Sequence, residues 1–457
     1  MTEITGPVHL VGIGGMHMSA IAILLRERGV VVTGSDLRPS ALTERVGALG
    51  ATVYTGHAAA NVGDPVLVVT TAAAGDDNPE IVEARRRGIP VILRAEMVAR
   101  LMEGKRVIAV AGAHGKTTTS SMIAFILREA GLNPMYLLGG ESIDLGGHAA
   151  WGEGELCVVE ADEYKRAFLE YTPAVAVITN VEADHLDYYG TEAAYHEAFA
   201  DFARTIEAGG RLVACWDDEG ARAVSEAVED EPIGVESYGI DGPRFWQATS
   251  IVEGPDGLSF EVRRGGGVIG RLRSSRLFGA HFVRNATAAT AVCTGLGVPF
   301  RVIAEAVARF RGAHRRFEQV GEAGGVLVMD DYAHHPTEVR ATIAAARAAF
   351  PERRLVVVYQ PHTYSRIAYL WDEWTRCWAG VDELIVLETY AARELPEAGR
   401  SAADLAAAIT EPPAQYARDF DEAARMAVEA ASAGDVVFTM GAGDVTDVGP
   451  MIVERLR

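Results

Sequence analysis

The segment of this sequence best suited to carry chemistry is a short loop rich in glycine and threonine, AGAHGKTTT at residues 111–119. Gly112 and Gly115 allow backbone N–H groups to close on phosphate oxygens. The ammonium group of Lys116 can neutralise a β- or γ-phosphate, and the hydroxyl of Thr117 can bind Mg²⁺. These residue types at this spacing predict a phosphate-binding loop.

The surroundings of the loop favour this interpretation over a chance GKT triplet. An apolar run at residues 106–110 precedes the loop and a helical pattern follows it, as in known phosphate loops. The loop is shorter than a Walker A motif, because Val110 stands where the first glycine of that motif would be. Lys116 is one of only three lysines, against 39 arginines, which is consistent with a need for a compact ammonium.

Acidic side chains follow the next two apolar runs, in VVEADEY and NVEADHLD. The carboxyl ends of parallel strands share one edge of a sheet, so we expect these acids near the phosphate loop. Glu160 suits a hard Mg²⁺ ion, whereas a neutral nitrogen of His185 is a less usual magnesium ligand. For Asp162, Glu163 and Asp187 we expect solvated loop acids.

A second glycine loop, GIGGMH at residues 12–17, follows the first apolar run and opens a helix. Dinucleotide-binding folds place a diphosphate at such a turn, and Asp36 stands where an acid would bind ribose hydroxyls. However, His17 occupies the last glycine position of that motif. A nucleotide-diphosphate substrate fits better than a dinucleotide, and a plain tight turn remains an equal alternative.

Two further segments carry polar groups that suit a nucleotide. In FGAHFVRNATAATA, His281 and Asn285 stand one helical turn apart, and an amide suits an adenine edge. The alternative is a cap at the start of a helix. The run RRF at residues 315–317 offers guanidinium groups that could clamp a phosphate.

Histidines gather at two predicted strand ends near the carboxyl terminus, in DDYAHHPTE and YQPHTYSR. The alternative is a scatter of surface histidines. Because both clusters follow strands of one sheet, we expect them to form a pocket for the acceptor substrate. The residues concerned are Tyr332, His334, His335, His362 and Arg366.

Apolar runs alternate with helical periodicity along most of the chain, which predicts parallel sheets covered by helices, an α/β fold. Residues 243–276 differ, because turn glycines separate short alternating runs and predict an antiparallel meander. We expect three α/β domains, at residues 1–103, 104–311 and 312–457.

Composition excludes several classes of protein. The 457 residues carry a formal charge of −21, which argues against a nucleic-acid-binding surface. Hydrophobic residues at 49% and charged residues at 23% exclude disorder. Four scattered cysteines indicate a reducing compartment, and neither a signal peptide nor an apolar run of about 18 residues is found. We therefore expect a soluble cytoplasmic protein without an evident protein partner.

Taken together and in order, the motifs resemble those of the Mur ligases of peptidoglycan synthesis, most of all the branch that adds L-alanine to UDP-N-acetylmuramate. The similarity extends along the whole chain. The matching segments are VGIGGMHMSAIA, GSD, TTAAAGDDNPE, RAEM, AGAHGKTTT, VVEADEY, TNVEADHLDYYG, GAHFVRNA, FRGAHRRFE, DDYAHHPTE, QPHTYSR and MGAGDV.

The resemblance implies a Rossmann-like first domain that binds the UDP group, a central phosphate-loop domain that binds ATP, and a Rossmann-like third domain that closes over both with the amino acid. It implies transfer of the ATP γ-phosphoryl group to the lactyl carboxylate of the sugar. The amine of L-alanine would then attack the acyl phosphate, giving an amide, ADP and phosphate. A histidine of DDYAHHPTE is a candidate base for the amine proton.

The resemblance also implies roles for individual residues. Catalytic roles fall on Lys116, Glu160, His185, His334 and Arg366. Contacts with ATP fall on Gly112, His114, Gly115, Lys116, Thr117, Thr118, His281, Asn285, Arg316 and Asp331. Magnesium would be held by Thr117, Glu160 and His185. Substrate contacts fall on Gly14, Gly15, Ser35, Asp36, Tyr332, His334, His362 and Arg366.

Four residues depart from the family pattern. His17 replaces a glycine, Lys165 an aspartate, Phe282 an asparagine and Thr363 an arginine. Many relatives use a carbamylated lysine after the DH motif, and no lysine follows Lys165, as in the alanine-adding branch. The departures leave open a sister ligase that attaches a preformed peptide, or a paralogue with another substrate. More distant alternatives are an NAD-dependent oxidoreductase and a non-catalytic nucleotide-binding regulator.

Overall fold

The structure is a computed structural model that describes residues 4–71, 74–392, 394–395 and 399–457. Ala72 and Ala73, within the TTAAAGDDNPE motif, lie outside the described residues, and so do the side chains of Leu186 and Asp187. The chain forms two compact units. The first comprises residues 1–248, 262–270 and 284–310, and the second comprises residues 249–261, 271–283 and 311–457.

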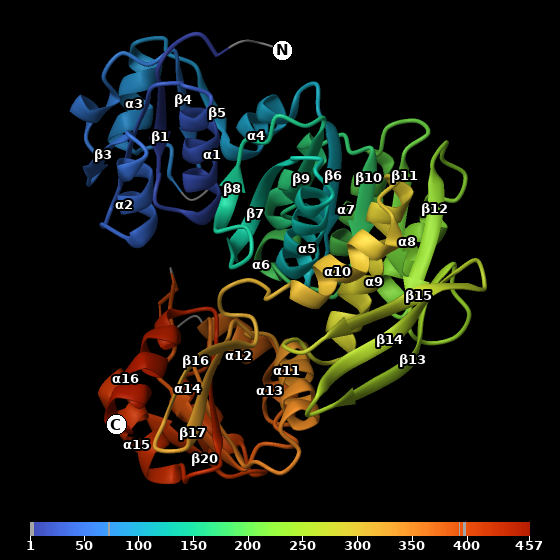
Figure 1. The fold of residues 1–457 in the computed structure, drawn as a ribbon. Coiled ribbons are helices and arrows are strands. Elements are labelled where there is room, and N and C mark those ends of the chain that lie inside the picture. The colour runs from blue at the N-terminus through green and yellow to red at the C-terminus, as the bar shows by residue number, and fades with distance from the viewer. Residues whose placement is uncertain (1–3, 72–73, 393, 396–398) are drawn as a thin grey trace. The chain divides into compact units, whose positions relative to one another are not determined.

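The first unit begins with a five-stranded parallel sheet in the order β3-β2-β1-β4-β5 (Figure 1). Its central strands are fully buried, and their sequences, VHLV and LVVT, are mostly apolar. The strands are β1 (Val8–Val11), β2 (Val32–Asp36), β3 (Thr52–Thr55), β4 (Leu67–Thr70) and β5 (Val91–Leu93). The helices are α1 (Met16–Glu27), α2 (Ala41–Ala48), η1 (Ala59–Val62), α3 (Pro79–Arg86) and α4 (Arg94–Met102).

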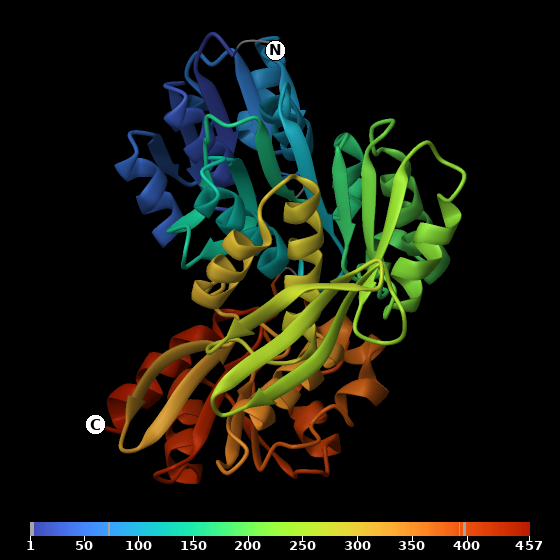
Figure 2. The same ribbon diagram turned by 45° about the vertical axis from the view of Figure 1, so that its right-hand side comes forward.

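A ten-stranded sheet follows, in the order β15-β14-β13-β12-β11-β10-β6-β9-β7-β8. The region predicted as a meander forms β13, β14 and β15, the three strands at one edge of this sheet. They are long and lie side by side in Figure 2, and their residues are divided between the two units. The strands are β6 (Arg106–Ala111), β7 (Met135–Ser142), β8 (Gly147–Ala150), β9 (Leu156–Glu160), β10 (Val175–Ile178), β11 (Arg211–Cys215), β12 (Gly234–Gly239), β13 (Trp246–Gly254), β14 (Gly257–Arg264) and β15 (Gly267–Ser274).

Among the helices that accompany the ten-stranded sheet, α5 positions the phosphate loop. Its residues Thr119–Leu127 are buried, and Phe125 packs on Phe310 with ring centroids 6.0 Å apart. The helix therefore has little freedom to shift its amino-terminal end. The helices here are α5 (Lys116–Glu129), η2 (Tyr164–Glu170), α6 (Leu186–Tyr189), α7 (Glu192–Arg204), α8 (Glu219–Ala227), α9 (Ala280–Gly295) and α10 (Phe300–Arg309).

The second unit is built on a six-stranded sheet in the order β16-β17-β21-β18-β19-β20, parallel except for β16. Apolar side chains form a buried core on each face of this sheet. The strands are β16 (Glu318–Ala323), β17 (Val326–Asp331), β18 (Leu355–Tyr359), β19 (Glu383–Leu387), β20 (Ala414–Ala417) and β21 (Val436–Met440). The helices are α11 (Pro336–Ala349), α12 (Tyr364–Tyr369), α13 (Trp371–Trp374), α14 (Ala402–Ala408), α15 (Phe420–Ala430), η4 (Asp444–Asp447) and α16 (Val448–Arg455).

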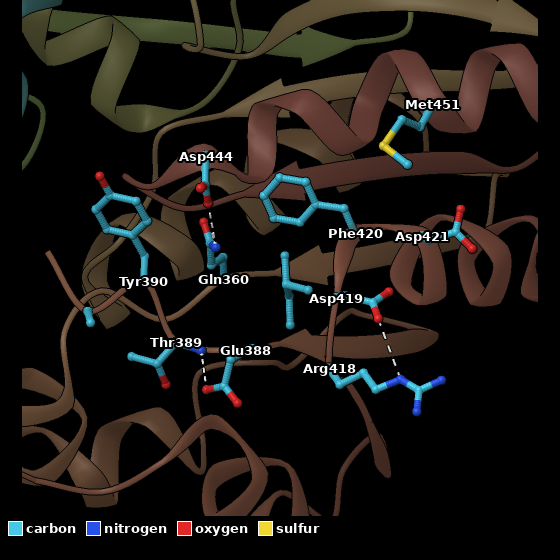
Figure 3. Close-up of a pocket in the computed structure, with 12 residues that line it drawn as sticks. Gln360, Glu388, Thr389, Tyr390, Arg418, Asp419, Phe420, Asp421, Asp444 and Met451 are labelled. Carbon is cyan, nitrogen blue, oxygen red and sulfur yellow. Dashed lines mark hydrogen bonds and ion pairs between the residues drawn. The ribbon is translucent and has the colours of Figure 1, made fainter. Parts of the chain in front are cut away.

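A hollow of about 600 Å³ lies where β18, β19 and β20 end (Figure 3). Its lining includes Gln360, Glu388, Tyr390, Phe420 and Asp444. Ligands of open parallel sheets bind at the carboxyl ends of the strands, which is the edge where this hollow lies.

Candidate active site

The phosphate loop joins the buried strand β6 to α5, and its glycines are required by the backbone. Gly112 and Gly115 have positive φ angles of 140° and 80°. A Cβ atom at Gly112 would lie 2.0 Å from Oγ1 of Thr179, and one at Gly115 would lie 2.9 Å from Oδ1 of Asn285. The loop is therefore closely packed, and Asn285 lies against it, which places this predicted adenine-binding residue at the loop.

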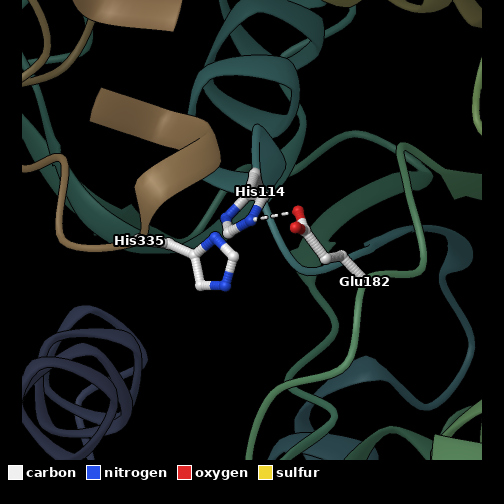
Figure 4. Close-up of side chains that lie close together, drawn as sticks. All are labelled: His114, Glu182 and His335. Carbon is white, nitrogen blue, oxygen red and sulfur yellow. Dashed lines mark hydrogen bonds and ion pairs between the residues drawn. The ribbon is translucent and has the colours of Figure 1, made fainter. Parts of the chain in front are cut away.

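Side chains at the end of β10 hold the loop in shape. Asn180 accepts the N–H of His114 through Oδ1 at 2.8 Å and donates to the His114 carbonyl at 2.9 Å. The hydroxyl of Thr179 donates to the same carbonyl at 2.6 Å. The ring of His114 lies 3.1 Å from a carboxylate oxygen of Glu182 (Figure 4). Sequence reasoning did not single out Thr179 or Asn180, although both follow an apolar strand as the predicted acids do.

Lys116 is held by a carboxylate that the sequence analysis placed in solvent. Its Nζ donates to both carboxylate oxygens of Glu163, at 2.9 and 3.1 Å. The expectation for Glu163 is wrong, because this side chain is almost completely buried. Burial alone would lower the pKa of Lys116, but the carboxylates of Glu163 and Glu160 outweigh it and raise that pKa.

The expectation of a solvated loop acid is also wrong for Asp162. Its carboxylate accepts from Arg94 of α4 at 2.7 Å, and only about a quarter of its side chain is exposed. Burial would raise the pKa of Asp162, but the positive charge of Arg94 lowers it to about 2. The negative charge of Asp162 therefore pairs the segment that follows β9 with α4, a helix of the first sheet.

Oxygen ligands suited to Mg²⁺ lie together beside the loop. The Thr117 hydroxyl donates to Oε2 of Glu160 at 2.9 Å, and the N–H of Gly139 in β7 donates to the same oxygen at 2.8 Å. Glu160 is buried, so its carboxylate is held in one place. This donor set fits a hard divalent ion that also binds phosphate oxygens. His185 lies nearby, with Nε2 3.9 Å from Glu163 and its ring 4.9 Å from that of Tyr164.

In the amino-terminal loop, the carboxylate of Asp36 accepts the N–H of Gly14 at 2.9 Å. Gly15 is exposed at the start of α1, where none of the described side chains caps the helix. Ser35 is different, because it is fully buried and its hydroxyl donates to Glu80 at 2.5 Å. The structure therefore brings Gly14, Gly15 and Asp36 together and turns the side chain of Ser35 into the core.

His17 lies in the first turn of α1. Its Nε2 is buried and has no hydrogen-bond partner among the residues that the structure describes. Burial lowers the pKa of His17 to about 3, and the charge of Arg94 acts in the same direction. His17 is thus neutral near pH 7, and the turn before α1 is made by Gly12, at a φ of 82°.

In the second unit, Arg315 and Arg316 both lie over the ring of Tyr332, with Cζ 5.0 and 4.9 Å from its centroid. Asp331 is buried and accepts from the backbone N–H groups of Phe317 and Ala333, at 2.8 and 2.9 Å. Burial raises the pKa of Asp331 to about 6. Both predicted residues, Arg316 and Asp331, therefore lie at one end of β17.

The predicted histidine cluster is real. The rings of His334 and His362 are 6.1 Å apart, and Nη1 of Arg366 lies 3.1 Å from Nδ1 of His362. Burial and the charge of Arg366 lower the pKa of His362 to about 4. His362 also stacks on Tyr390 at 5.5 Å, which joins the cluster to the hollow at this edge.

The second histidine of DDYAHHPTE has a structural task. His335 is buried and caps α11, since its ring accepts from the N–H of Thr337 while Glu338 accepts from the N–H of His335. His334 is more exposed, and its Nδ1 lies 3.1 Å from Glu338. Of the two, His334 is the one available to a substrate. His281 and the buried Phe282 lie in the first turn of α9.

Comparison with known proteins identifies the family. Three family models match in chain order: "Mur ligase family, catalytic domain" at residues 7–106, "Mur ligase middle domain" at 110–293 and "Mur ligase, glutamate ligase domain" at 315–443. The UDP-N-acetylmuramate–L-alanine ligase of Roseiflexus sp. (strain RS-1) is 44% identical over 462 residues, covering 98% of this chain and 99% of the relative. The chain belongs to the Mur ligase family.

Solved Mur ligases have the same fold. UDP-N-acetylmuramate-alanine ligase from Thermotoga maritima is 29% identical, with 98% of each chain covered and a TM-score of 0.83. A murein peptide ligase from Psychrobacter arcticus 273-4 is 25% identical, covering 99% of this chain and 98% of its own, with a TM-score of 0.72. The predicted α/β fold and the predicted family are therefore confirmed.

Membership in the family has direct consequences. Mur ligases are ATP-dependent enzymes, so the chain is an ATP-dependent ligase. Among the described residues, no helix is both long and apolar enough to cross a membrane.

Proposed function

We propose that this Mur ligase joins L-alanine to the lactyl carboxylate of UDP-N-acetylmuramate in the cytoplasm, with ATP and Mg²⁺, and releases ADP and phosphate. The observation that carries the proposal is the 44% identity with a relative of that name over nearly the full length of both chains. We assign the UDP-sugar to residues 1–103, ATP to residues 104–311 and the amino acid to residues 312–457.

The first step is transfer of the ATP γ-phosphoryl group to the carboxylate. The Pγ–O bond of ATP breaks as a carboxylate oxygen bonds to phosphorus, leaving ADP and an acyl phosphate. Positioning and neutralisation of charge supply most of the catalysis in such transfers. Backbone N–H groups from Gly115 to Thr118, at the start of α5, would cradle the phosphates, and Lys116 would offset their charge. Thr117 and Glu160 would hold Mg²⁺, with His185 as a further ligand, and the ion would supply positive charge against the phosphates.

The second step is attack of the alanine amine on the acyl carbon, which expels phosphate and forms the amide. The amine loses a proton in this step, and we assign its removal to His334, since His335 is committed to capping α11. Arg366 can pair with a carboxylate of the substrates, beside the neutral His362 and Tyr332. The remaining proposed contacts are Gly14, Gly15 and Asp36 for the UDP-sugar and His114, Thr118, His281, Asn285, Arg316 and Asp331 for ATP.

A ligase for a preformed peptide is the second candidate, because Thr363 replaces an arginine of the family pattern. The hydroxyl of Thr363 donates to Glu394 at 2.7 Å, next to His362 of the proposed substrate cluster. The substitution therefore changes the charge of the site that we assign to the amine.

Phosphate release separates the two candidates. Each amine is supplied singly with UDP-N-acetylmuramate and MgATP: L-alanine, glycine, L-serine or a preformed tripeptide. We expect kcat/KM to be at least about tenfold higher with L-alanine than with the tripeptide, which corresponds to about 1.4 kcal/mol of transition-state discrimination. Release of phosphate with the tripeptide and with none of the three amino acids would reject the proposal.

A further inference from the structure

The ammonium group of Lys116 is surrounded by acceptors of the protein itself. Besides both oxygens of Glu163, it donates to the carbonyl oxygen of Gly112 at 2.5 Å and to that of Ala113 at 3.3 Å. An ammonium has three N–H donors, so Glu163, Gly112 and Ala113 account for all of them. The contact with Ala113 is the longest, and a phosphate oxygen in the loop can replace it at the least cost.

Glu163 itself is firmly anchored. Its backbone carbonyl accepts the Tyr189 hydroxyl at 2.5 Å and the N–H of Arg166 at 2.9 Å. The preceding residue, Asp162, is tied to Arg94. With its side chain buried, the carboxylate has little room to follow Lys116 if the ammonium moves.

From these contacts we infer that Glu163 is a positioning residue, which holds the ammonium of Lys116 at one point over the phosphate loop during phosphoryl transfer. The inference rests on the proposed function. Glu163 and Gly112 retain two of the N–H donors, while the third turns from Ala113 to the transferred phosphoryl group. A lysine side chain has four rotatable bonds, so without this anchor the ammonium would occupy several positions and stabilise the transition state less.

The anchor leads to a distinct kinetic signature. Glu163→Gln removes the charge that fixes Lys116, and it also removes a negative charge close to the bound phosphates. Ground-state binding of ATP is therefore not weakened, whereas transition-state stabilisation is. We expect kcat to fall about 10- to 100-fold, with the Kd of ATP, measured by calorimetry, unchanged or lower.

A double-mutant cycle shows whether Glu163 acts through Lys116. In Lys116→Ala the residual kcat should not fall further when Glu163→Gln is added, because the anchored group is already absent. Glu197→Gln, an exposed acid on α7 paired with Arg204, is the matched control and should keep wild-type kcat. Wild-type turnover in the same assay shows that the proposed reaction occurs.

Three results would overturn the inference: a Glu163→Gln enzyme with kcat within twofold of the wild type, a large rise in the Kd of ATP, or a further loss of kcat in the Lys116→Ala background. If Glu163→Gln does not fold, Glu163→Asp serves instead, since it keeps the charge but withdraws it by one methylene. Glu163→Asp should lower kcat by less than we expect for Glu163→Gln, and it should leave the Kd of ATP unchanged.

Discussion

One oxygen of Glu160 receives both the Thr117 hydroxyl and the N–H of Gly139, so the proposed magnesium site depends on a glycine with no chemistry of its own. A Cβ atom at Gly139 would lie 2.3 to 2.5 Å from the carboxylate of Glu160. That distance is too short for any real contact, and the buried carboxylate would have to leave its place.

We therefore expect Gly139→Ala to raise the Mg²⁺ concentration needed for half-maximal activity at least about tenfold, as is typical when the support of a metal ligand is disturbed. A magnesium titration of phosphate release measures this. Gly47→Ala in α2 is the control, because a Cβ atom there would meet no atom of the described part of the chain within 4 Å. A Gly139→Ala enzyme with the magnesium dependence of the wild type would contradict the assigned site.

Single residues also show what the sequence could and could not predict. Thr117 and Glu160 meet as predicted, because the ends of neighbouring parallel strands lie at one edge whatever the side chains are. Glu163 and Asp162 were assigned wrongly to solvent. Their partners, Lys116 and Arg94, lie 47 and 68 residues away in sequence, and no local pattern reveals such a pairing.

Four elements of the amino-terminal sheet region meet at the fully buried carboxylate of Glu80, at the start of α3. It lies 3.5 Å from His9 of β1, accepts from Ser35 of β2 at 2.5 Å and from Asn61 of η1 at 2.7 Å. Burial would raise the pKa of Glu80, but these hydrogen bonds lower it from 4.5 to about 2.

Because its folded-state pKa is depressed, Glu80 contributes stability that is complete above about pH 4.5 and is lost as the pH falls through about 2. We expect Glu80→Gln to lower the free energy of unfolding by about 2 to 3 kcal/mol at pH 7, and by less than half of that at pH 3. Denaturant unfolding at the two pH values measures the difference. An equal loss at both would show that the ionised carboxylate is not the source of the stability.

Prediction of elements succeeded where strands are buried on both faces. The strands β17, β18, β19 and β21 read as continuous apolar runs, and each is buried or almost entirely buried. The edge strands β16 and β20 were not predicted, because each is half-exposed and its sequence mixes polar and apolar residues. Their pairing depends on a neighbouring strand and cannot be read from their own composition.

At the scale of the whole molecule, a chain of charge −21 that binds anions needs local sites rather than a basic surface. Two cations of the proposed sites have an acidic neighbour, Glu163 beside Lys116 and Glu338 3.6 Å from Arg316, and Asp162 lies beside the nearby Arg94. In the proposed ATP site, oriented backbone N–H groups at the start of α5 would supply the rest of the attraction for phosphate.

The remaining lysines have other tasks. Lys105, between the first and second sheets, donates to the carbonyl oxygens of Gly152 and Gly154, at 2.8 and 2.6 Å, and lies over the ring of Trp151. These contacts account for a lysine that no sequence motif explains. Lys165 lies over the ring of Tyr164, beside the anchored acids.

We propose that amide formation proceeds through an acyl phosphate on the lactyl carboxylate. UDP-N-acetylmuramate labelled with ¹⁸O in both oxygens of that carboxylate tests it, with MgATP and L-alanine, by mass spectrometry of the products. An acyl phosphate sends one labelled oxygen into inorganic phosphate and leaves the other in the amide. We predict labelled phosphate in an amount equal to that of the alanyl product. Formation of the amide with unlabelled phosphate, or release of phosphate without any amide, would contradict it.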